Sequence, residues 1–347
     1  MKVLLYGANG YTGKLMLDEA IQQGIQPVLG GRNESAVAAL ADQYKLEYRI
    51  FGLDDSDELA SQLDGIGVVC HAAGPFEFTA WPMIKACLKR GVHYLDITGE
   101  ITVFEGAARY DEKARQANVM VMPGTGFDVV PTDCLALHLK ERMPDATHLQ
   151  LAFASVGSGP SHGTALTFAG HIGEGGVVRE NGKLKRVPLG HKSQWIDFPG
   201  RKMHVMAIPW GDIATAFRST GIPNIETYMG AKPATARQLK WQWAYNWLLR
   251  TSFVRNYIRQ QIKKRPAGPD EATRLKAKSV VWGQVRNASG NILTASLRTP
   301  EGYTLTAKSS ILICKKVLAG DWKPGYQTPA MAYGPDLIME IPGVERF

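Results

Sequence analysis

Short apolar runs alternate with amphipathic segments along the first third of the chain. Runs of strand length lie at residues 2–6, 27–29, 48–51, 67–71, 93–97 and 119–122. Between them, apolar positions recur at helical spacing, as Val37, Leu40, Ala41 and Tyr44 illustrate. This alternation predicts parallel βαβ units in a doubly wound, Rossmann-type α/β sheet.

The pattern changes after about residue 131. Glycine-rich segments separate strand-like runs, and the runs 280–287 and 292–298 predict a β-hairpin that residues 303–307 should continue. Antiparallel strands of this kind indicate a second, mixed α+β domain. We therefore expect one domain over 1–130 and another over 131–325, with the tail 326–347 packing back on the first.

Composition narrows the class of protein. The chain has 347 residues, 45% of them hydrophobic and 21% charged, which suits two domains with proper cores. The four cysteines are scattered without a C-x-x-C pair and the eight histidines are dispersed, so we expect no disulfide framework and no metal site. No apolar run is long enough for a signal peptide or a membrane span, which favours a cytoplasmic protein.

The formal net charge of +8 is concentrated in one segment. Between Lys232 and Arg265 the sequence has nine Lys or Arg residues and no acid, and the remainder is close to neutral. This distribution does not favour a general nucleic-acid-binding face.

The same segment, 235–265, is rich in aromatic residues such as Trp241, Trp243 and Trp247. Two interpretations are open for it. Helices could pack these aromatics inward with their basic ends in water, which we favour, or the segment could make a peripheral contact with a membrane or cover an acyl substrate. A homodimer interface is a further alternative.

A glycine-rich turn joins the first predicted strand to the first helix. Residues 7–13 read Gly-Ala-Asn-Gly-Tyr-Thr-Gly, a G-x-x-G-x-x-G pattern. Glycine lets backbone N–H groups approach a pyrophosphate, and the following helix N-terminus favours negative charge. The strand–turn–helix context favours a dinucleotide site over a structural turn. The expected contacts are Gly7, Asn9, Gly10, Tyr11, Thr12 and Gly13.

Arg32 follows the second strand, where NAD enzymes usually place the acid that binds the ribose 2′-hydroxyl. A guanidinium can instead bind a 2′-phosphate in a bidentate manner, so NADP (NADPH) is the expected cofactor, while Glu34 keeps NAD open. Asn33 and Ser35 could add hydrogen bonds. Asp54, after the third strand, would border the adenine pocket or cap the next helix, and we favour the cap.

Residues 72–76, Ala-Ala-Gly-Pro-Phe, follow the fourth strand. Ligands of open α/β sheets bind at the carboxyl ends of strands, and small residues there would let a cofactor pass. The expected cofactor contacts here are Ala73, Gly74, Pro75 and Phe76, of which Pro75 and Phe76 could wall the nicotinamide. An ordinary strand-to-helix turn is equally compatible with them.

These motifs, with 94–100 (Tyr-Leu-Asp-Ile-Thr-Gly-Glu) and 126–133 (Gly-Phe-Asp-Val-Val-Pro-Thr-Asp), resemble the saccharopine dehydrogenase-like oxidoreductases. The 126–133 element is more similar to the trans-acting enoyl reductase branch, because true saccharopine reductases carry Asp-Pro-Gly there. The resemblance implies an NADP-binding domain over 1–130 and a substrate or dimerisation domain over 131–325. It also implies hydride transfer between nicotinamide and a hydrophobic, acyl- or enoyl-type small molecule.

Two alternatives to that function remain. One is a saccharopine-type C–N oxidoreductase of amino-acid metabolism. The other is a nucleotide-binding, membrane-associated accessory protein without turnover, which the basic aromatic segment would suit.

Hydride transfer also needs a proton donor or a polarising group beside the acceptor. The candidates are Glu100 after the fifth strand, Asp128 after the sixth, and His162 in the second domain. A structural turn is as good an explanation for Asp128, and a loop position is the favoured one for His162.

Overall fold

The computed structural model describes residues 1–170 and 172–347, which form two compact units. The first unit comprises 1–130 and 303–334, and the second comprises 131–302 and 335–347. The sequence-based division assigns 303–325 to the second domain and the whole tail to the first. The structure differs because 303–318 form a helix of the first unit, whereas 345–346 pair with a strand of the second.

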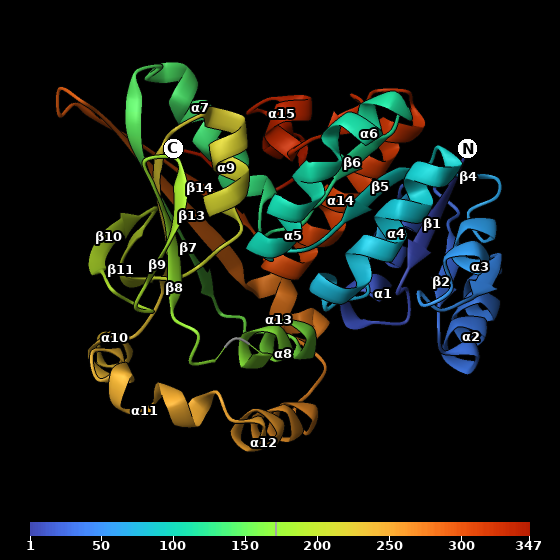
Figure 1. Cartoon of the computed structure of the whole chain (residues 1–347), viewed down its shortest axis with the longest axis horizontal. Coiled ribbons are helices and arrows are strands. Elements are labelled where there is room, and N and C mark those ends of the chain that lie inside the picture. Colours follow the sequence, from blue (N-terminus) through green and yellow to red (C-terminus); the bar gives the residue numbers. More distant parts are fainter. Residues whose placement is uncertain (171) are drawn as a thin grey trace. The chain divides into compact units, whose positions relative to one another are not determined.

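The first unit is built on a seven-stranded sheet in the order β15-β6-β5-β4-β1-β2-β3. Each pair of neighbouring strands in this sheet is parallel, which confirms the Rossmann-type sheet (Figure 1). Its strands are β1 (Lys2–Tyr6), β2 (Val28–Gly31), β3 (Tyr48–Ile50), β4 (Ile66–His71), β5 (His93–Asp96), β6 (Met120–Met122) and β15 (Gly325–Tyr326).

Helices cover both faces of this sheet. They are α1 (Tyr11–Gln22), α2 (Glu34–Tyr44), α3 (Ser56–Ser61), α4 (Phe76–Arg90), α5 (Ile101–Ala107), the 3-10 helix η1 (Ala108–Tyr110), α6 (Asp111–Gln116), α14 (Gly302–Leu318) and α15 (Pro329–Tyr333). Leu59 of α3, Met83 of α4 and Val103 of α5 share one core on one face. On the other face α14 lies beside α1, where Lys308 pairs with Glu19 at 3.2 Å.

The prediction of a strand over 303–307 is wrong, because these residues begin α14. Leu305, Ser309 and Ile313 are all buried and lie four residues apart, so they form one helical face against the unit. The hydroxyl of Ser309 donates to the carbonyl of Thr125 at 2.7 Å. The small polar residues of α14 thus bind the loop that follows β6.

The strand order places a switch point between β1 and β4. From β1 the chain continues to β2 on one side, and from β4 it continues to β5 on the other. Connections that diverge in this way leave a crevice at the carboxyl ends of the two central strands, where such folds bind ligands. Gly7 and Ala72 are the residues that directly follow β1 and β4.

The second unit has a nine-stranded sheet with the path β10-β11-β12-β7-β13-β14-β16, to which β8 and β9 are attached through β12. Its strands are β7 (Ala146–Val156), β8 (Gly176–Glu180), β9 (Lys183–Val187), β10 (Ser193–Phe198), β11 (Arg201–Ala207), β12 (Asn224–Gly230), β13 (Lys278–Asn287), β14 (Ile292–Pro300) and β16 (Glu345–Arg346). Because β12 and β7 are parallel while the hairpin β13–β14 is antiparallel, the predicted mixed α+β architecture is confirmed.

Both faces of the second sheet are packed. A Cβ on Gly283 of β13 would meet Leu139 and Leu135 of α7, so α7 covers the face on which Gly283 lies. Val280 and Trp282 alternate with that position and pack into a cluster with Phe198 on the opposite face. The helices of this unit are α7 (Val130–Arg142), α8 (His162–Gly170), α9 (Asp212–Thr220), α10 (Pro233–Leu239), α11 (Gln242–Leu249), α12 (Ser252–Lys263), α13 (Glu271–Lys276) and the 3-10 helix η2 (Leu337–Glu340).

The basic aromatic segment forms the three helices α10, α11 and α12 (Figure 1). Thr251 interrupts it, since its hydroxyl accepts a hydrogen bond from the Val254 N–H as the N-cap of α12. Among the described residues, no helix combines the length and apolar character needed to cross a bilayer.

Candidate cofactor site

Two glycines of the first turn are required by close packing. Gly7 has φ of 87°, and a Cβ on it would lie 2.9 Å from the Cβ of Ala73. A Cβ on Gly13 would overlap the carbonyl oxygen of Gly7. The turn after β1, the start of α1 and the turn after β4 are therefore in direct contact, as a phosphate-binding turn at the switch point requires.

The remaining residues of the turn, from Gly10 to Thr12, form the start of α1. Gly10 is the N-cap of α1, and its N–H donates to the Gly7 carbonyl at 3.0 Å. Tyr11 and Thr12 open the helix. The ring of Tyr11 makes an edge contact with Tyr303 at 5.2 Å between centroids, so it helps to hold the start of α14.

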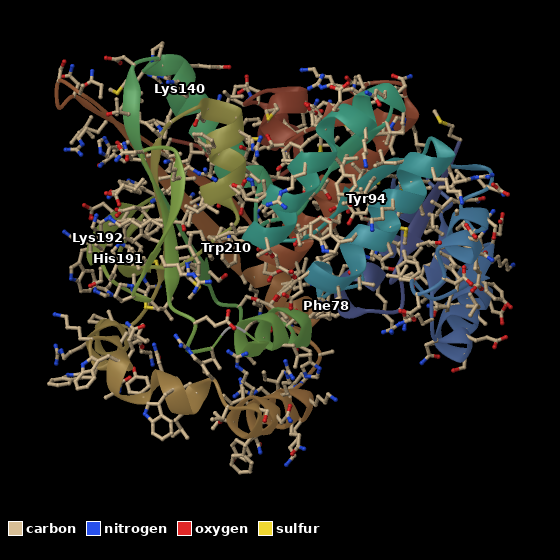
Figure 2. The ribbon with its side chains drawn as sticks, in the orientation of Figure 1. Phe78, Tyr94, Lys140, His191, Lys192 and Trp210 are labelled. Carbon is tan, nitrogen blue, oxygen red and sulfur yellow. The ribbon has the colours of Figure 1, made fainter. Side chains whose placement is uncertain are left out.

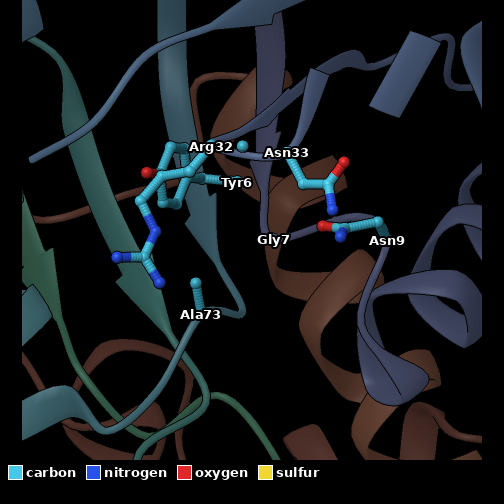
Figure 3. Close-up of a pocket in the computed structure, with 7 residues that line it drawn as sticks. Tyr6, Gly7, Asn9, Arg32, Asn33 and Ala73 are labelled. Carbon is cyan, nitrogen blue, oxygen red and sulfur yellow. The ribbon is translucent and has the colours of Figure 1, made fainter. Parts of the chain in front are cut away.

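A cavity of about 500 Å³ opens beside this turn (Figure 3). It is lined by Tyr6, Gly7, Asn9, Gly31, Arg32, Asn33 and Ala73. The residues expected to bind the pyrophosphate and the 2′-substituent are thus brought together at the ends of β1, β2 and β4. In Figure 3 the guanidinium of Arg32 extends along the cavity toward Ala73.

Arg32 is the charged residue of this lining, which contains no carboxylate. Glu34, the acid that keeps NAD open, is an exposed residue in the first turn of α2 and does not line the cavity. A lining with a guanidinium and no carboxylate favours a ligand with a negatively charged group at this end.

Asn33 and Ser35 are engaged with each other at the start of α2. Asn33 Oδ1 accepts hydrogen bonds from the Ala36 N–H at 3.1 Å and the Ser35 hydroxyl at 3.0 Å. Asn33 therefore caps α2 as well as lining the cavity, and Ser35 supports that cap.

The prediction that Asp54 caps the helix after the third strand is wrong by one residue. Asp55 is the N-cap of α3, and its Oδ1 accepts from the N–H groups of Asp57 and Glu58 at 2.9 and 3.0 Å. Asp54 instead influences Tyr6, a residue that lines the cavity, because the negative charge of Asp54 helps to raise the pKa of Tyr6.

Tyr6 and Gly31 line the cavity although sequence reasoning missed them. Burial raises the pKa of Tyr6 to about 12, and its hydroxyl donates to the carbonyl of Phe51 at 3.1 Å. The signal was available, since Tyr6 ends β1 and Gly31 ends β2, at the edge of the sheet that binds ligands.

The turn after β4 is fixed by Glu100. The N–H groups of Phe76 and Glu77 donate to the two carboxylate oxygens of Glu100 at 3.0 and 2.7 Å. Glu100 thereby satisfies the N-terminus of α4, directly after Gly74 and Pro75, which do not line the cavity. This contact gives Glu100 a structural task beside the catalytic one predicted for it.

The neighbouring aspartate of the 94–100 motif is structural as well. Asp96 is fully buried, and it accepts from the Tyr94 hydroxyl at 2.7 Å and from the N–H groups of Thr98 and Gly124 at 2.9 Å. Burial raises the pKa of Asp96 to about 7. It ties the turn after β5 to the turn after β6.

Asp128 lies in that second turn, on the loop between β6 and α7. Burial raises the pKa of Asp128 to about 7, so this carboxyl group exchanges a proton near neutral pH. A Cβ on Gly99 would overlap Asp128 Oδ2, which shows how closely the carboxylate lies against the turn after β5. The pKa of Asp128 suits general acid chemistry at neutral pH.

His162 is the first residue of α8 rather than a loop residue. Its N–H donates to the carbonyl of Ala267, and its Nε2 lies 2.5 Å from the carbonyl of Arg265. These contacts join the start of α8 to the segment that follows α12. They provide a structural explanation for this histidine.

A second cavity, of about 750 Å³, lies in the second unit between β8, β12 and the start of β7. Two ion pairs lie in its lining: Lys192 Nζ donates to Glu226 at 2.5 Å, and Lys185 contacts Glu180 at 2.5 Å. Figure 2 shows Lys192 beside His191 at this place. We assign no ligand to this cavity.

Comparison with known proteins agrees with this site. The saccharopine dehydrogenase NADP-binding domain family matches residues 3–122. The human saccharopine dehydrogenase-like oxidoreductase is 26% identical over 181 residues, which cover 46% of this chain and 42% of that protein. The match thus spans less than half the length of this relative. A trans-acting enoyl reductase of Mycobacterium ulcerans is 26% identical over 152 residues, covering 41% of this chain and 36% of that protein.

The fold is shared over nearly the whole chain with a solved structure. Apo saccharopine dehydrogenase (L-Glu forming) from Saccharomyces cerevisiae superimposes with a TM-score of 0.65 at 14% identity, covering 98% of this chain and 96% of that one. The parallel strand order and the glycine turn are those of a Rossmann-type dinucleotide-binding domain. Residues 3–122 match the saccharopine dehydrogenase NADP-binding domain family, and the resemblance to the saccharopine dehydrogenase-like oxidoreductases is confirmed.

Proposed function

We propose that the chain is an NADP-dependent oxidoreductase that transfers hydride between nicotinamide and a hydrophobic, acyl- or enoyl-type substrate. Arg32 carries the proposal, because it lies in the lining of the cavity beside the glycine turn and that lining has no carboxylate. The 2′-phosphate is the group that distinguishes NADP from NAD, and a guanidinium is its usual partner.

The turn after β4 supports an apolar acceptor. Phe76 lies at its end with 9% exposure, and Phe78, two residues further along α4, is 69% exposed. Phe78 is labelled in Figure 2. An exposed phenyl group next to the turn expected to line the nicotinamide suits an acyl chain better than a charged amino acid.

NADPH, when bound, would supply hydride from nicotinamide C4 to one carbon of an activated C=C bond, leaving NADP⁺. The other carbon then takes a proton, so the double bond becomes a single bond. We assign that proton to Asp128, whose pKa of about 7 lets it hold a proton at neutral pH. Glu100 keeps the turn after β4 in position through its contacts with the N–H groups of Phe76 and Glu77.

The cofactor assignment can be tested by calorimetric titration of the purified protein with NADPH and with NADH. We expect tighter binding of NADPH, and an Arg32→Ala variant should lose about tenfold or more in NADPH affinity with little change for NADH. Arg109→Ala is the matched control, since Arg109 is an exposed arginine of the same unit that does not line the cavity.

Equal affinity for NADPH and NADH in the wild-type protein would contradict the NADP assignment. Absence of binding to either nucleotide would contradict the proposal that the chain is a nicotinamide-dependent enzyme. The accessory protein without turnover would then be the better explanation.

The C–N oxidoreductase of amino-acid metabolism is the second candidate, because the whole-chain fold similarity is to a saccharopine dehydrogenase. The two candidates differ in acceptor. NADPH oxidation with 2-enoyl thioesters of increasing chain length would support the first. Activity confined to an amino acid with a 2-oxo acid would support the second. The cytoplasmic location stays a prediction for both.

A further inference from the structure

The aromatic residues of the basic segment are exposed, so the inward-packing interpretation is wrong. Trp241, Trp243, Trp247, Phe253 and Tyr257 are between 58% and 81% exposed. Trp243 and Trp247 lie four residues apart on α11, and Phe253 and Tyr257 four apart on α12, so each helix presents a pair of rings on one side. We call Trp241, α11 and α12 the aromatic surface.

Other residues attach these helices to the second unit. Gln242 is buried, with its side chain accepting from the Leu189 N–H at 3.1 Å and donating to the Leu189 carbonyl at 2.8 Å. Ile262 is buried near the end of α12, which packs against α8. Because attachment uses these positions, the exposed rings are not needed to hold the helices in place.

The arginines divide into two groups. Arg250 Nε donates to the Gly173 carbonyl at 2.7 Å, and Arg255 donates to the Ile172 carbonyl at 3.1 Å and to Glu174 at 3.0 Å. These two therefore anchor the helices. The cations Lys240, Arg259, Lys263 and Lys264 are exposed beside the rings.

The positive charge of the basic aromatic segment indicates which kind of partner it binds. It has nine Lys or Arg residues and no acid between Lys232 and Arg265, so it complements a negatively charged surface. Contact with a second copy across a two-fold axis would place the same cationic surface on both sides, which like charges disfavour. Exposed tryptophans among lysines and arginines match the boundary between acyl chains and headgroups.

We propose that the aromatic surface binds the face of an anionic phospholipid bilayer. Trp243, Trp247 and Phe253 insert among the headgroups, while Lys240, Arg259 and Lys263 lie over lipid phosphates. This inference rests on the second unit alone and is independent of the proposed reaction.

Vesicle co-sedimentation of the full chain tests it, with vesicles of phosphatidylcholine alone and of phosphatidylcholine mixed with phosphatidylglycerol. The protein should bind the mixed vesicles, and added salt should weaken the binding. A Trp243→Ser/Trp247→Ser/Phe253→Ser variant should lose about tenfold or more in vesicle affinity, since the rings supply the buried apolar area. A Lys240→Gln/Arg259→Gln/Lys263→Gln variant should show a similar loss on mixed vesicles.

Matched controls come from the rest of the chain. Trp195→Ser removes a ring that is 58% exposed on β10, outside the aromatic surface, and should bind vesicles as the wild-type protein does. Arg109→Gln/Arg201→Gln/Lys278→Gln removes three exposed cations from elsewhere. An unchanged unfolding midpoint and NADPH titration in each variant show that the fold is intact.

Three results would overturn the proposal. The first is a wild-type protein that does not bind the mixed vesicles, and the second is vesicle binding that survives both surface variants. The third is a concentration-dependent dimer, seen by sedimentation velocity, that the aromatic variant converts to a monomer in the absence of any vesicle binding. That last result would make the surface an interface between copies of the chain.

Discussion

The Cα of Gly13 is packed against the carbonyl oxygen of Gly7, so closely that a Cβ on Gly13 would overlap this oxygen. The oxygen belongs to the backbone of the nucleotide turn and also accepts the Gly10 N–H at 3.0 Å. Neither group can move without shifting the turn relative to the first turn of α1. The close approach of helix and strand therefore depends on glycine at position 13.

A Gly13→Ala substitution should lower the free energy of unfolding by about 1–3 kcal/mol, the usual cost of inserting a methyl group into a filled space. NADPH affinity should fall with it, because the start of α1 is displaced from the turn. Gly52→Ala is the control, since its Cβ would lie 3.8 Å from the nearest atom, Asp54 Oδ2. Denaturant titration and calorimetry of both variants measure these effects, and equal behaviour of the two would contradict the packing argument.

The glycine turn and Arg32 could be predicted from the sequence because they are local. A strand, a glycine-rich turn and a helix follow one another directly, and the residue after β2 lies at the same edge of the sheet. Contacts between distant segments could not be predicted in this way. The bonds from the N–H groups of Phe76 and Glu77 to Glu100 join two turns that no sequence period links.

The exposure of the aromatic residues in the basic segment could not be predicted for a related reason. Helical spacing shows that Trp243 and Trp247 share a face, but it does not show whether another element covers that face. The tight attachment comes from Gln242, a polar residue whose role depends on Leu189. Likewise, Leu305, Ser309 and Ile313 form one helical face, but the short run 303–307 alone does not distinguish a strand from the start of a helix.

Glu100 should behave mainly as a structural residue. Glu100→Ala removes both acceptors from the N-terminus of α4 and should reduce the free energy of unfolding by about 1–2 kcal/mol. Glu100→Gln keeps one acceptor oxygen, so its free energy of unfolding should fall by a smaller amount. Glu58→Gln is the control, because it neutralises an exposed carboxylate in the first turn of α3. A large fall in the rate of NADPH oxidation at an unchanged unfolding midpoint would instead identify Glu100 as the proton donor.

Asp55 and Asp54 are adjacent but should respond differently to substitution. Asp55→Ala removes the N-cap of α3 and should lower the unfolding midpoint, whereas Asp54→Ala should leave it nearly unchanged. Two backbone N–H groups lower the pKa of Asp55, so its contribution is present above the pKa of the unfolded chain and is lost as pH falls through the folded pKa. The difference between wild type and Asp55→Ala should therefore disappear in acid, as thermal unfolding over a pH series would show. If Asp54→Ala lowered the unfolding midpoint more than Asp55→Ala does, Asp54 rather than Asp55 would be the N-cap of α3.

Removal of Asp54 should also be visible at Tyr6. The Asp54 charge is one of the groups that raise the Tyr6 pKa, so Asp54→Asn should bring that pKa down from about 12. Spectrophotometric titration of the tyrosines, with Tyr6→Phe to identify the signal, measures the change. An unaltered Tyr6 pKa in the Asp54→Asn variant would show that the charge of Asp54 does not act on Tyr6.

Asp128 provides the pH dependence expected of the reaction. Burial raises its pKa from 3.8 to about 7, so it carries a proton below pH 7 and loses it above. If it donates the proton, kcat/KM for NADPH-dependent reduction should fall as pH rises through 7, and Asp128→Asn should be slow and lack that limb of the profile.

The stability of the protein should change in the same pH range and with a definite sign. Because the folded pKa is raised, the folded state holds a proton that the unfolded chain has already released between pH 3.8 and 7. Stability therefore falls as pH rises through this window, and Asp128→Asn should gain stability relative to wild type above pH 7. Gly99→Ala supplies a second test, since its Cβ would displace the Asp128 carboxylate without removing it. An unchanged pH profile in both variants would show that the proton comes from another group.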